Sequence, residues 1–495
     1  MEVLDTSIAN VALPHIAGNL SSTIDEATWV LTSYLVANAI VLPITGWLSN
    51  YIGRKRLLMT VVTGFTVSSV LCGLAPSLPF LVVCRILQGT TGGGLQPLSQ
   101  AVLLEEFPPE RRGTAMAVWG MGIVVMPILG PIIGGWITDS FSWRWVFFIN
   151  LPIGIGSLIL IHLFLYDPSY IRRRSSQIDF WGFSLLAIWI ASLQIMLDKG
   201  QQDDWFDSRF ITTLAVIAAV GFVAFVIREL WTKEPIVHLR LMAYRTFSTG
   251  VGLVALLGVI LYGGLVILPL FLQELLGYNA MTAGALTSPR GVGTMIFMPL
   301  AGYLLGRRFD SRIMMTIGMT VAGIALLAFS RMTLDVGLSY IIWVGIIQGC
   351  GMGFLFVPLT TTTVDPIPLP EMGYATSLYS LSRNIGGSFG IAFVTTLLAR
   401  RAQFHQNVLV AHLTPSSPVF RTLLRGTRGL LQQRGINPAN APHAALALLY
   451  GQLLRQATYF SYMDVFLVLG ILFFCGIPFL WLMHKPRTGR RAGAH

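Results

Sequence analysis

The chain has 495 residues, of which 54% are hydrophobic and only 11% are charged, and its formal net charge is +11. A soluble domain carries about 25% charged residues, and the shortage here runs along the whole length, so the composition excludes a soluble globular protein. The four cysteines lie in apolar segments without the spacing of metal ligands, which indicates packing residues and no metal site.

Apolar segments long enough to cross a bilayer, roughly 20 residues each, recur throughout the chain. A β-barrel would show short segments of alternating hydrophobicity instead. We therefore expect an all-α polytopic membrane protein with fourteen transmembrane helices. In chain order the predicted spans are 1–20, 28–50, 57–76, 79–104, 114–137, 145–165, 180–199, 210–230, 247–273, 283–305, 313–331, 338–364, 372–398 and 461–483.

Basic residues are concentrated in alternate loops, which predicts that both termini are cytoplasmic. The short loops on the opposite side hold only Arg144, Lys199, Arg209 and Arg331. The positive charge thus indicates an inner surface that faces anionic lipid, and it argues against nucleic-acid binding. The predicted inner loops and tail contain Arg54–Arg56, Arg111, Arg112, Arg172–Arg174, Arg228, Lys233, Arg240, Arg245, Arg307, Arg308, Arg312, Lys485, Arg487, Arg490 and Arg491.

The chain also repeats itself. The segments "VLPITGWLSNYIGRKRLLMT" from Val41 and "FMPLAGYLLGRRFDSRIMMT" from Phe297 match at an offset of 256, and Gln88 and Gln348 lie in matching segments at an offset of 260. Two parallel six-helix halves around a midplane site are typical of secondary transporters. We predict a first half at 1–165, a two-helix insert with its loops at 166–246, a second half at 247–483 and a basic cytoplasmic tail at 484–495.

Four motifs carry a family resemblance. "GWLSNYIGRKRL" (46–57), "RILQGTTGGG" (85–94), "GIVVMPILGPIIGG" (122–135) and "LDTSIANVALP" (4–14) resemble motifs of the major facilitator superfamily. The last two resemble those of its fourteen-helix drug:proton antiporter branch, closer to EmrB-type multidrug pumps than to the QacA type. The resemblance implies export of amphipathic drugs or toxic compounds across the cell inner membrane, driven by a proton gradient without a cofactor.

The resemblance also implies partners. EmrB-type pumps pass substrate to a periplasmic adaptor and an outer-membrane channel, and the long outer loop at 399–460 is the candidate docking segment. Its sequence predicts amphipathic helical pieces interrupted by prolines. The alternative is a lid packed on the outer face of the transporter itself. The interrupting residues are Pro415, Pro418, Pro438 and Pro442.

The antiporter motif is rich in glycine. Gly130, Gly134 and Gly135 lie on nearly one helical face and allow close helix contact, while Pro131 removes a backbone donor and bends the span. Such a face suits a seal between the two halves in one access state. The alternative is the glycine-rich packing that is common among membrane helices.

The loop at 46–57 is a candidate cytoplasmic latch. Gly46 and Gly53 permit a close approach and a turn, and Asn50 stands where the superfamily has an aspartate, which removes one charged partner. The basic residues of the latch can contact acidic groups or helix C-termini, or they can simply set the topology. They are Arg54, Lys55 and Arg56.

Charges inside predicted spans are unfavourable and therefore indicate function. They are Asp5, Arg85, Arg290 and Arg383, and Asp5 is the one carboxylate that we place deep in a span. The other acidic residues near spans are assigned to span ends, where they serve topology or helix capping. These are Glu105, Glu106, Asp179, Asp365, Glu371 and Asp464.

Asp5 is the predicted proton carrier, and Arg85 is its predicted electrostatic partner. Because Arg383 and Asn384 occupy the place of a second carboxylate in span 13, we expect neutral, weakly acidic or monocationic hydrophobic substrates. Several amides in apolar spans are candidates for the substrate cavity, or they bond a neighbouring helix instead. They are Asn10, Asn38, Gln96, Gln100, Gln273 and Gln348.

Two alternatives to drug export stay open. One is a proton-coupled metabolite transporter of the same fold, and the other is a membrane-embedded enzyme such as an acyltransferase. The start of the chain raises a separate expectation. Only four residues precede Asp5. At the repeat offset of 256, Met1 aligns with Leu257, whereas the matching span begins near Phe247, so the first half is roughly ten residues shorter than the second. This predicts that the native protein begins upstream of Met1.

Overall fold

The computed structural model describes residues 1–166, 179–232, 235–307, 309–413 and 417–483. Several predicted loop features lie outside these residues. They are Arg172–Arg174, Lys233, Arg308, Pro415 and the basic tail at 484–495.

The first half begins with α1 (Glu2–Asn19) and a short α2 (Ile24–Ala27). The second predicted span is built from three consecutive pieces, and the fourth from two. The elements are α3 (Trp29–Val41), η1 (Leu42–Ile44), α4 (Thr45–Ile52), α5 (Arg54–Gly73), α6 (Leu78–Gly92), α7 (Leu95–Glu106), α8 (Pro109–Ser140), α9 (Trp145–Phe148) and α10 (Asn150–Phe164).

The insert and the second half also consist of long α-helices with short helical pieces between them. The insert consists of α11 (Phe180–Lys199), η2 (Trp205–Asp207) and α12 (Arg209–Trp231), followed by η3 (Leu239–Ala243). The second half contains α13 (Arg245–Glu274), α14 (Ala280–Thr287), α15 (Pro289–Gly306), α16 (Ser311–Phe329), α17 (Leu338–Val364), η4 (Leu369–Glu371), α18 (Met372–His412), α19 (Pro418–Gln433) and α20 (Ala441–Leu480).

The all-helical prediction is confirmed, because every regular element in the described ranges is a helix. Within those ranges nine helices are long and apolar enough to cross a membrane, or ten if the bent α8 counts as one span. Each predicted span coincides with one helix or with consecutive helices. The chain is thus a multi-pass membrane protein, and the exact number of fourteen crossings stays a prediction.

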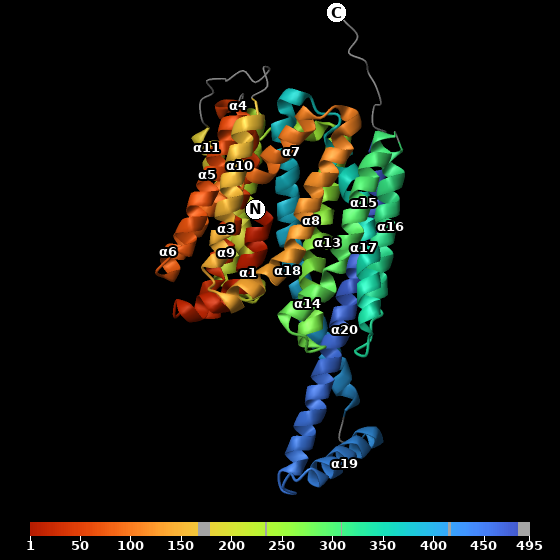
Figure 1. Ribbon diagram of the computed structural model, residues 1–495. Helices are drawn as coiled ribbons and strands as arrows, with labels where there is room; N and C mark the ends of the chain where they lie inside the picture. Colours follow the sequence, from red (N-terminus) through yellow and green to blue (C-terminus); the bar gives the residue numbers. More distant parts are fainter. Residues whose placement is uncertain (167–178, 233–234, 308, 414–416, 484–495) are drawn as a thin grey trace, which may run out of the picture.

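The two halves lie mostly side by side (Figure 1), with the first in red to yellow and the second in green to blue. They meet tightly at the end of the bundle that holds the α4–α5 turn, here called the Gly53 end. A Cβ atom on Gly46 would lie 2.7 Å from the backbone of Gly373 in α18, and one on Gly113 would lie 2.9 Å from the backbone of Gly302 in α15. Only glycine permits such backbone contact.

The insert contacts both halves. At α3, Asp198 of α11 accepts a hydrogen bond from Thr32. At α18, Gln194 Nε2 of the same helix donates to Ser388 Oγ over 2.7 Å. The inserted pair is therefore part of the transporter bundle, and movement of the halves relative to each other must alter at least one of these contacts.

The predicted outer loop is largely a helical projection. Helices α18 and α20 continue beyond the predicted spans, and α19 packs against α20 away from the bundle (Figure 1). Pro418 and Pro442 stand in the first turns of α19 and α20, where proline is favourable. The helical pieces were thus predicted correctly, whereas the alternative of a lid on the transporter's own face is wrong in this conformation.

Candidate transport site

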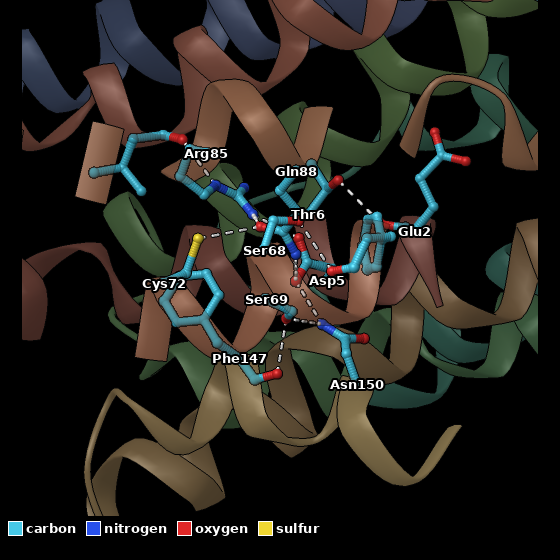
Figure 2. Close-up of polar contacts among 12 residues, drawn as sticks. Glu2, Asp5, Thr6, Ser68, Ser69, Cys72, Arg85, Gln88, Phe147 and Asn150 are labelled. Atoms are coloured by element: carbon cyan, nitrogen blue, oxygen red, sulfur yellow. Dashed lines mark hydrogen bonds and ion pairs between the residues drawn. The ribbon is translucent and has the colours of Figure 1, made fainter. Parts of the chain in front are cut away.

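Asp5 lies at the centre of a buried polar network in the first half (Figure 2). Its carboxylate is completely buried and accepts hydrogen bonds from three side chains on two other helices. Arg85 Nη1 donates to Oδ2 over 2.6 Å, Gln88 Nε2 to Oδ1 over 3.0 Å, and Asn150 Nδ2 to Oδ1 over 2.7 Å. The predicted pairing of Asp5 with Arg85 is therefore present in the structure.

Arg85 is held as firmly as its partner. Its Nε donates to the carbonyl oxygen of Val30 over 3.0 Å, and its Nη1 also contacts Gln88 Oε1 at 2.8 Å. The guanidinium lies 4.3 Å from the ring centroid of Tyr34 and 5.6 Å from that of Phe147. A charge pair away from water is stable only with such additional bonds, so this site is organised around one fixed ion pair.

Asn150 is a site residue that the sequence analysis missed. It is the first residue of α10, and its Nδ2 also approaches Ser69 Oγ at 3.0 Å, while Ser69 Oγ donates to the Phe147 carbonyl over 2.8 Å. One amide at a span end gives no signal in the sequence. Only the fold shows that α10 starts at the depth of Asp5.

Asp5 is not the only deep carboxylate, which corrects the sequence analysis. Glu2, one turn earlier on α1, is also buried, and its Oε1 accepts a hydrogen bond from Asn38 Nδ2 over 2.9 Å. Gln96 and Arg383 lie near this carboxylate, whose Oε2 is buried without a hydrogen bond to the described residues. Glu2 was overlooked because it stands at the edge of the predicted span.

Arg383 links the two halves at this point. Its Nη2 donates to Gln96 Oε1 of α7, and its guanidinium lies 5.8 Å from the ring of Trp119 in α8. Its Nη1 is buried and makes no hydrogen bond with the described residues. The Arg383–Gln96 hydrogen bond thus links the two halves, and together with the nearby Glu2 these residues are here called the polar bridge.

The candidate cavity amides behave differently from one another. Asn38 and Gln96 belong to the bridge just described, whereas Gln273 donates to the Pro269 carbonyl of its own helix. Asn10 is exposed. Gln348 is buried with Oε1 unpaired, and neither side-chain atom of buried Gln100 has a partner in the described part of the chain. Asn38 and Gln96 therefore bond neighbouring helices and also reach the boundary between the halves.

The antiporter motif packs within the first half. A Cβ atom on Gly130 would lie 2.2 Å from Ser7 Oγ, and one on Gly134 would lie 3.1 Å from the Ile8 side chain, so both glycines face α1. Gly135 has open space at this position. In this conformation the small residues bring α8 against a helix of its own half, and a seal between the halves in the other access state stays a prediction.

Pro131 bends α8 as predicted. The two parts of the helix meet at 45°, with the break just after Pro127. Proline at position 131 cannot donate to the carbonyl of residue 127, and Ser7 Oγ of α1 donates to that Pro127 oxygen over 3.0 Å. Pro131 also reaches the second half, since Gly284 of α14 lies beside it and Ile132.

The latch residues also make specific contacts. Gly53 has φ of +97°, a conformation that favours glycine. Lys55 Nζ donates to the His162 carbonyl at the C-terminal end of α10 over 2.7 Å, and Arg56 is exposed. Arg54 is buried in an ion pair with Glu105 of α7. Glu105 was assigned to a span end for topology or capping, and this contact corrects that assignment. Arg54 thus has a carboxylate partner in Glu105, although position 50 is an asparagine.

The other acidic residues that were assigned to span ends differ in their contacts. Asp179 caps α11 by accepting from the Gly182 amide over 3.1 Å, as expected for a span end. Asp464 contacts Arg401 at 2.6 Å and His405 at 2.7 Å at the base of the projection, and thus bonds side chains instead of capping a helix.

Comparison with known proteins identifies the family. The model of the Major Facilitator Superfamily matches residues 1–391. The chain belongs to the major facilitator superfamily. Since this family consists of transporters, the prediction of a transporter and not an enzyme is confirmed. Similar proteins include the fatty acid resistance protein FarB of Neisseria gonorrhoeae, 39% identical over all of this chain and 96% of FarB.

Multidrug export proteins are similar over comparable lengths. EmrB of Haemophilus influenzae is 41% identical over 85% of this chain and 82% of its own, and EmrB of Escherichia coli K12 is 35% identical over 100% and 95%. The expected likeness to EmrB-type pumps is thus confirmed. Among solved structures, the proton:xylose symporter XylE has a TM-score of 0.60 at 14% identity, covering 97% of this chain and 92% of XylE, and supports the fold alone.

Proposed function

We propose that this protein is a proton-driven antiporter that exports hydrophobic or amphipathic compounds from the cytoplasm by alternating access. The proposal includes fourteen membrane crossings, an inner-membrane location, cytoplasmic termini and a Gly53 end that faces the cytoplasm. Relatives named for multidrug export and fatty acid resistance support the direction and the substrate class. The single observation that carries the mechanism is the buried Asp5–Arg85 pair, a titratable charge within the membrane.

The proton step follows from the bonding of Asp5. An ionised Asp5 neutralises Arg85, and protonation removes that attraction and one hydrogen-bond acceptor site. The three donors to Asp5 lie on α6 and α10, so this change acts on packing inside the first half. Because α8 packs against α1 through Gly130 and Ser7, a shift of α1 passes to the helix that faces the second half.

Alternating access requires contacts that separate and form again. The backbone contacts of Gly46 with Gly373 and of Gly113 with Gly302 close the Gly53 end, which corresponds to an outward-facing or occluded state in the proposed orientation. The bridge from Glu2 through Gln96 to Arg383 also crosses between the halves. Protonation of Glu2 weakens this bridge, so Glu2 is the second carboxylate that we include in coupling.

The projection of α18, α19 and α20 is the proposed docking site for a periplasmic adaptor and an outer-membrane channel. Residues 399–460 contain seven arginines and no acidic residue. Helix α19 exposes Val419, Leu423 and Leu430 beside its arginines. This surface suits a partner with apolar and acidic side chains.

Reconstituted vesicles test the proposed function. The full chain in proteoliposomes should move an amphipathic dye against its gradient only while a proton gradient is imposed, and an uncoupler should stop the movement. Asp5→Asn at equal incorporation should lose uphill movement, whereas Asp464→Asn, outside the buried network, should retain it. Uphill transport by Asp5→Asn equal to wild type would exclude Asp5 as the proton carrier.

A further inference from the structure

A second charged site lies between the two halves, apart from the Asp5 network. It is a cavity whose wall combines the kink of α8 at Pro127 with Leu261 and Tyr262 of α13, Arg290 of α15, and α17. The lining is otherwise mainly apolar. In this conformation the cavity is small, about 20 Å³, so a transported molecule fits there only after the two halves move apart.

Arg290 has no polar partner here. Its side chain is 6% exposed, and its guanidinium makes no hydrogen bond or ion pair with any residue in the described ranges. The Tyr262 hydroxyl likewise makes no hydrogen bond with the described residues. The Thr294 hydroxyl donates to the backbone oxygens of Arg290 and Gly349, each at 3.2 Å. A buried charge without a partner is strongly unfavourable, so an anion in this cavity would stabilise Arg290.

The internal repeat shows how the first half neutralises its buried arginine at the corresponding positions. Tyr34 stands 256 positions before Arg290, and Leu261 stands 256 positions after Asp5. In the first half Tyr34 packs on an arginine that Asp5 neutralises. In the second half the arginine itself occupies the Tyr34 position, and leucine occupies the position of the carboxylate.

Helix α17, which packs beside Arg290, has a glycine at the repeat position of Arg85. Gly345 stands 260 positions after Arg85, and a Cβ atom on Gly345 would lie 3.8 Å from the backbone nitrogen of Arg290, so α17 packs against α15 at this point. By the repeat positions, the buried arginine thus stands on α6 in the first half and on α15 in the second. Only the first half supplies the anion as well.

We propose that Arg290 binds the anionic group of an exported amphiphile, such as a carboxylate, with the Tyr262 hydroxyl as a second donor. The inference rests on the proposed transport function and names the substrate class of this cavity. A guanidinium suits a planar carboxylate because it offers two parallel donors. The apolar walls from α8, α13 and α17 receive the hydrophobic body, and Leu261, at the repeat position of Asp5, belongs to the same wall.

Equilibrium binding to the full chain in lipid nanodiscs tests the site without any proton gradient, so a failure of proton-driven transport does not affect the result. The probes are 2-naphthoate and its neutral amide, 2-naphthamide, which share one ring system. Wild type should prefer naphthoate. Arg290→Gln should weaken naphthoate binding by roughly tenfold or more and leave naphthamide unchanged, since charged hydrogen bonds contribute on that scale. Arg290→Lys should keep part of the preference.

Arg307→Gln is the matched control, because Arg307 is an exposed cation at the end of the same helix. It should bind both probes as wild type does. Equal binding of the two probes by wild type, or an unchanged preference in Arg290→Gln, would overturn the proposal.

A second pair of variants keeps the test decisive if Arg290→Gln does not fold. Leu261→Asp supplies an internal carboxylate and should abolish the preference for naphthoate while naphthamide still binds. Leu261→Asn has the same shape without the charge and should retain the preference. If Leu261→Asp and Leu261→Asn bind naphthoate equally, Arg290 is not an anion site.

Discussion

The two halves of this transporter share a fold and differ in how they treat buried charge. In the first half, Asp5 and Arg85 neutralise each other and are surrounded by amide and hydroxyl groups. In the second half, Arg290 has no partner among the described residues, and Arg383 depends on Gln96 and Glu2 of the other half. One half thus holds its charge balance internally, and the other depends on the opposite half or on a ligand.

This difference separates two tasks. A closed ion pair responds to protons, whereas an open cationic site responds to an anion or to movement of the opposite half. Proton and substrate therefore act on different halves, and the contacts between the halves couple the two events. Substitutions that disturb charge in one half should therefore differ in effect from those that disturb the contacts between the halves.

The largest expected effect is on stability within the first half. Asp5→Asn leaves Arg85 buried without its counter-ion, which should destabilise the protein by about 3–5 kcal/mol. The double variant Asp5→Asn/Arg85→Gln removes both charges and should recover much of that loss while transport stays absent. Thermal unfolding in detergent measures both variants, and equal melting of the single and double variants would contradict a fixed ion pair.

The latch offers a similar but smaller contrast. Arg54→Gln leaves Glu105 buried and unpaired, so we expect a loss of about 3 kcal/mol or more. Arg56→Gln removes an exposed cation and should change stability by no more than about 0.5 kcal/mol. The same melting measurement applies. Equal effects of the two substitutions would show that the buried pair with Glu105 does not form.

The contact between the halves can be broken at Gly46. A methyl group there meets the Gly373 backbone at 2.7 Å, so Gly46→Ala should prevent closure of the Gly53 end and slow transport severalfold. Gly135→Ala, which has open space at its Cβ position, is the control and should transport at the wild-type rate. The measurement is the transport rate of each variant in proteoliposomes. A wild-type rate for Gly46→Ala would contradict the claim that closure of the Gly53 end is part of the transport cycle.

Glu2→Gln should have a moderate effect. The amide still pairs with Asn38 but loses its attraction to Arg383, so the bridge between the halves weakens without an unpaired buried charge in the first half. We expect retained binding and a transport rate that depends less on pH than in wild type. Rate measurements over a pH series test this, and a pH profile identical to wild type would exclude Glu2 from coupling.

The smallest effect on isolated transport should come from the projection. Deleting about 410–445 removes α19, which packs on α20 away from the bundle, so vesicle transport should persist. Resistance of intact cells should be lost if an adaptor docks here. Loss of transport in vesicles would instead assign the projection to the transport cycle itself.

The helices were predictable because apolar length and inner-loop charge act locally in the sequence. Asp5 and Arg85 were predictable as a pair for a related reason, since few charges lie inside spans and opposite charges need each other there. The contact of Arg54 with Glu105 was not predictable, because both residues stand near span ends where water is the simpler partner. The position of Gly130 against Ser7 depends on the crossing of α1 and α8, which no sequence period encodes.

The burial of Glu2 was also not predictable from the sequence. It lies one turn from Asp5, yet its surroundings come from α3, α7 and α18 together. The repeat aligned Tyr34 with Arg290, but only the packing of α15 against α17 at Gly345 shows the exchange of the arginine between helices. Residues whose role depends on three helices need the fold before they can be assigned.

The most direct test of the central claim is the direction of proton movement during transport. Proteoliposomes that contain the full chain and an internal pH dye, without an imposed proton gradient, are given an outward gradient of a neutral amphipathic substrate. Antiport through Asp5 predicts that protons enter as the substrate leaves, and that Asp5→Asn abolishes this acidification. Protons leaving together with the substrate, or acidification that persists in Asp5→Asn, would contradict the account.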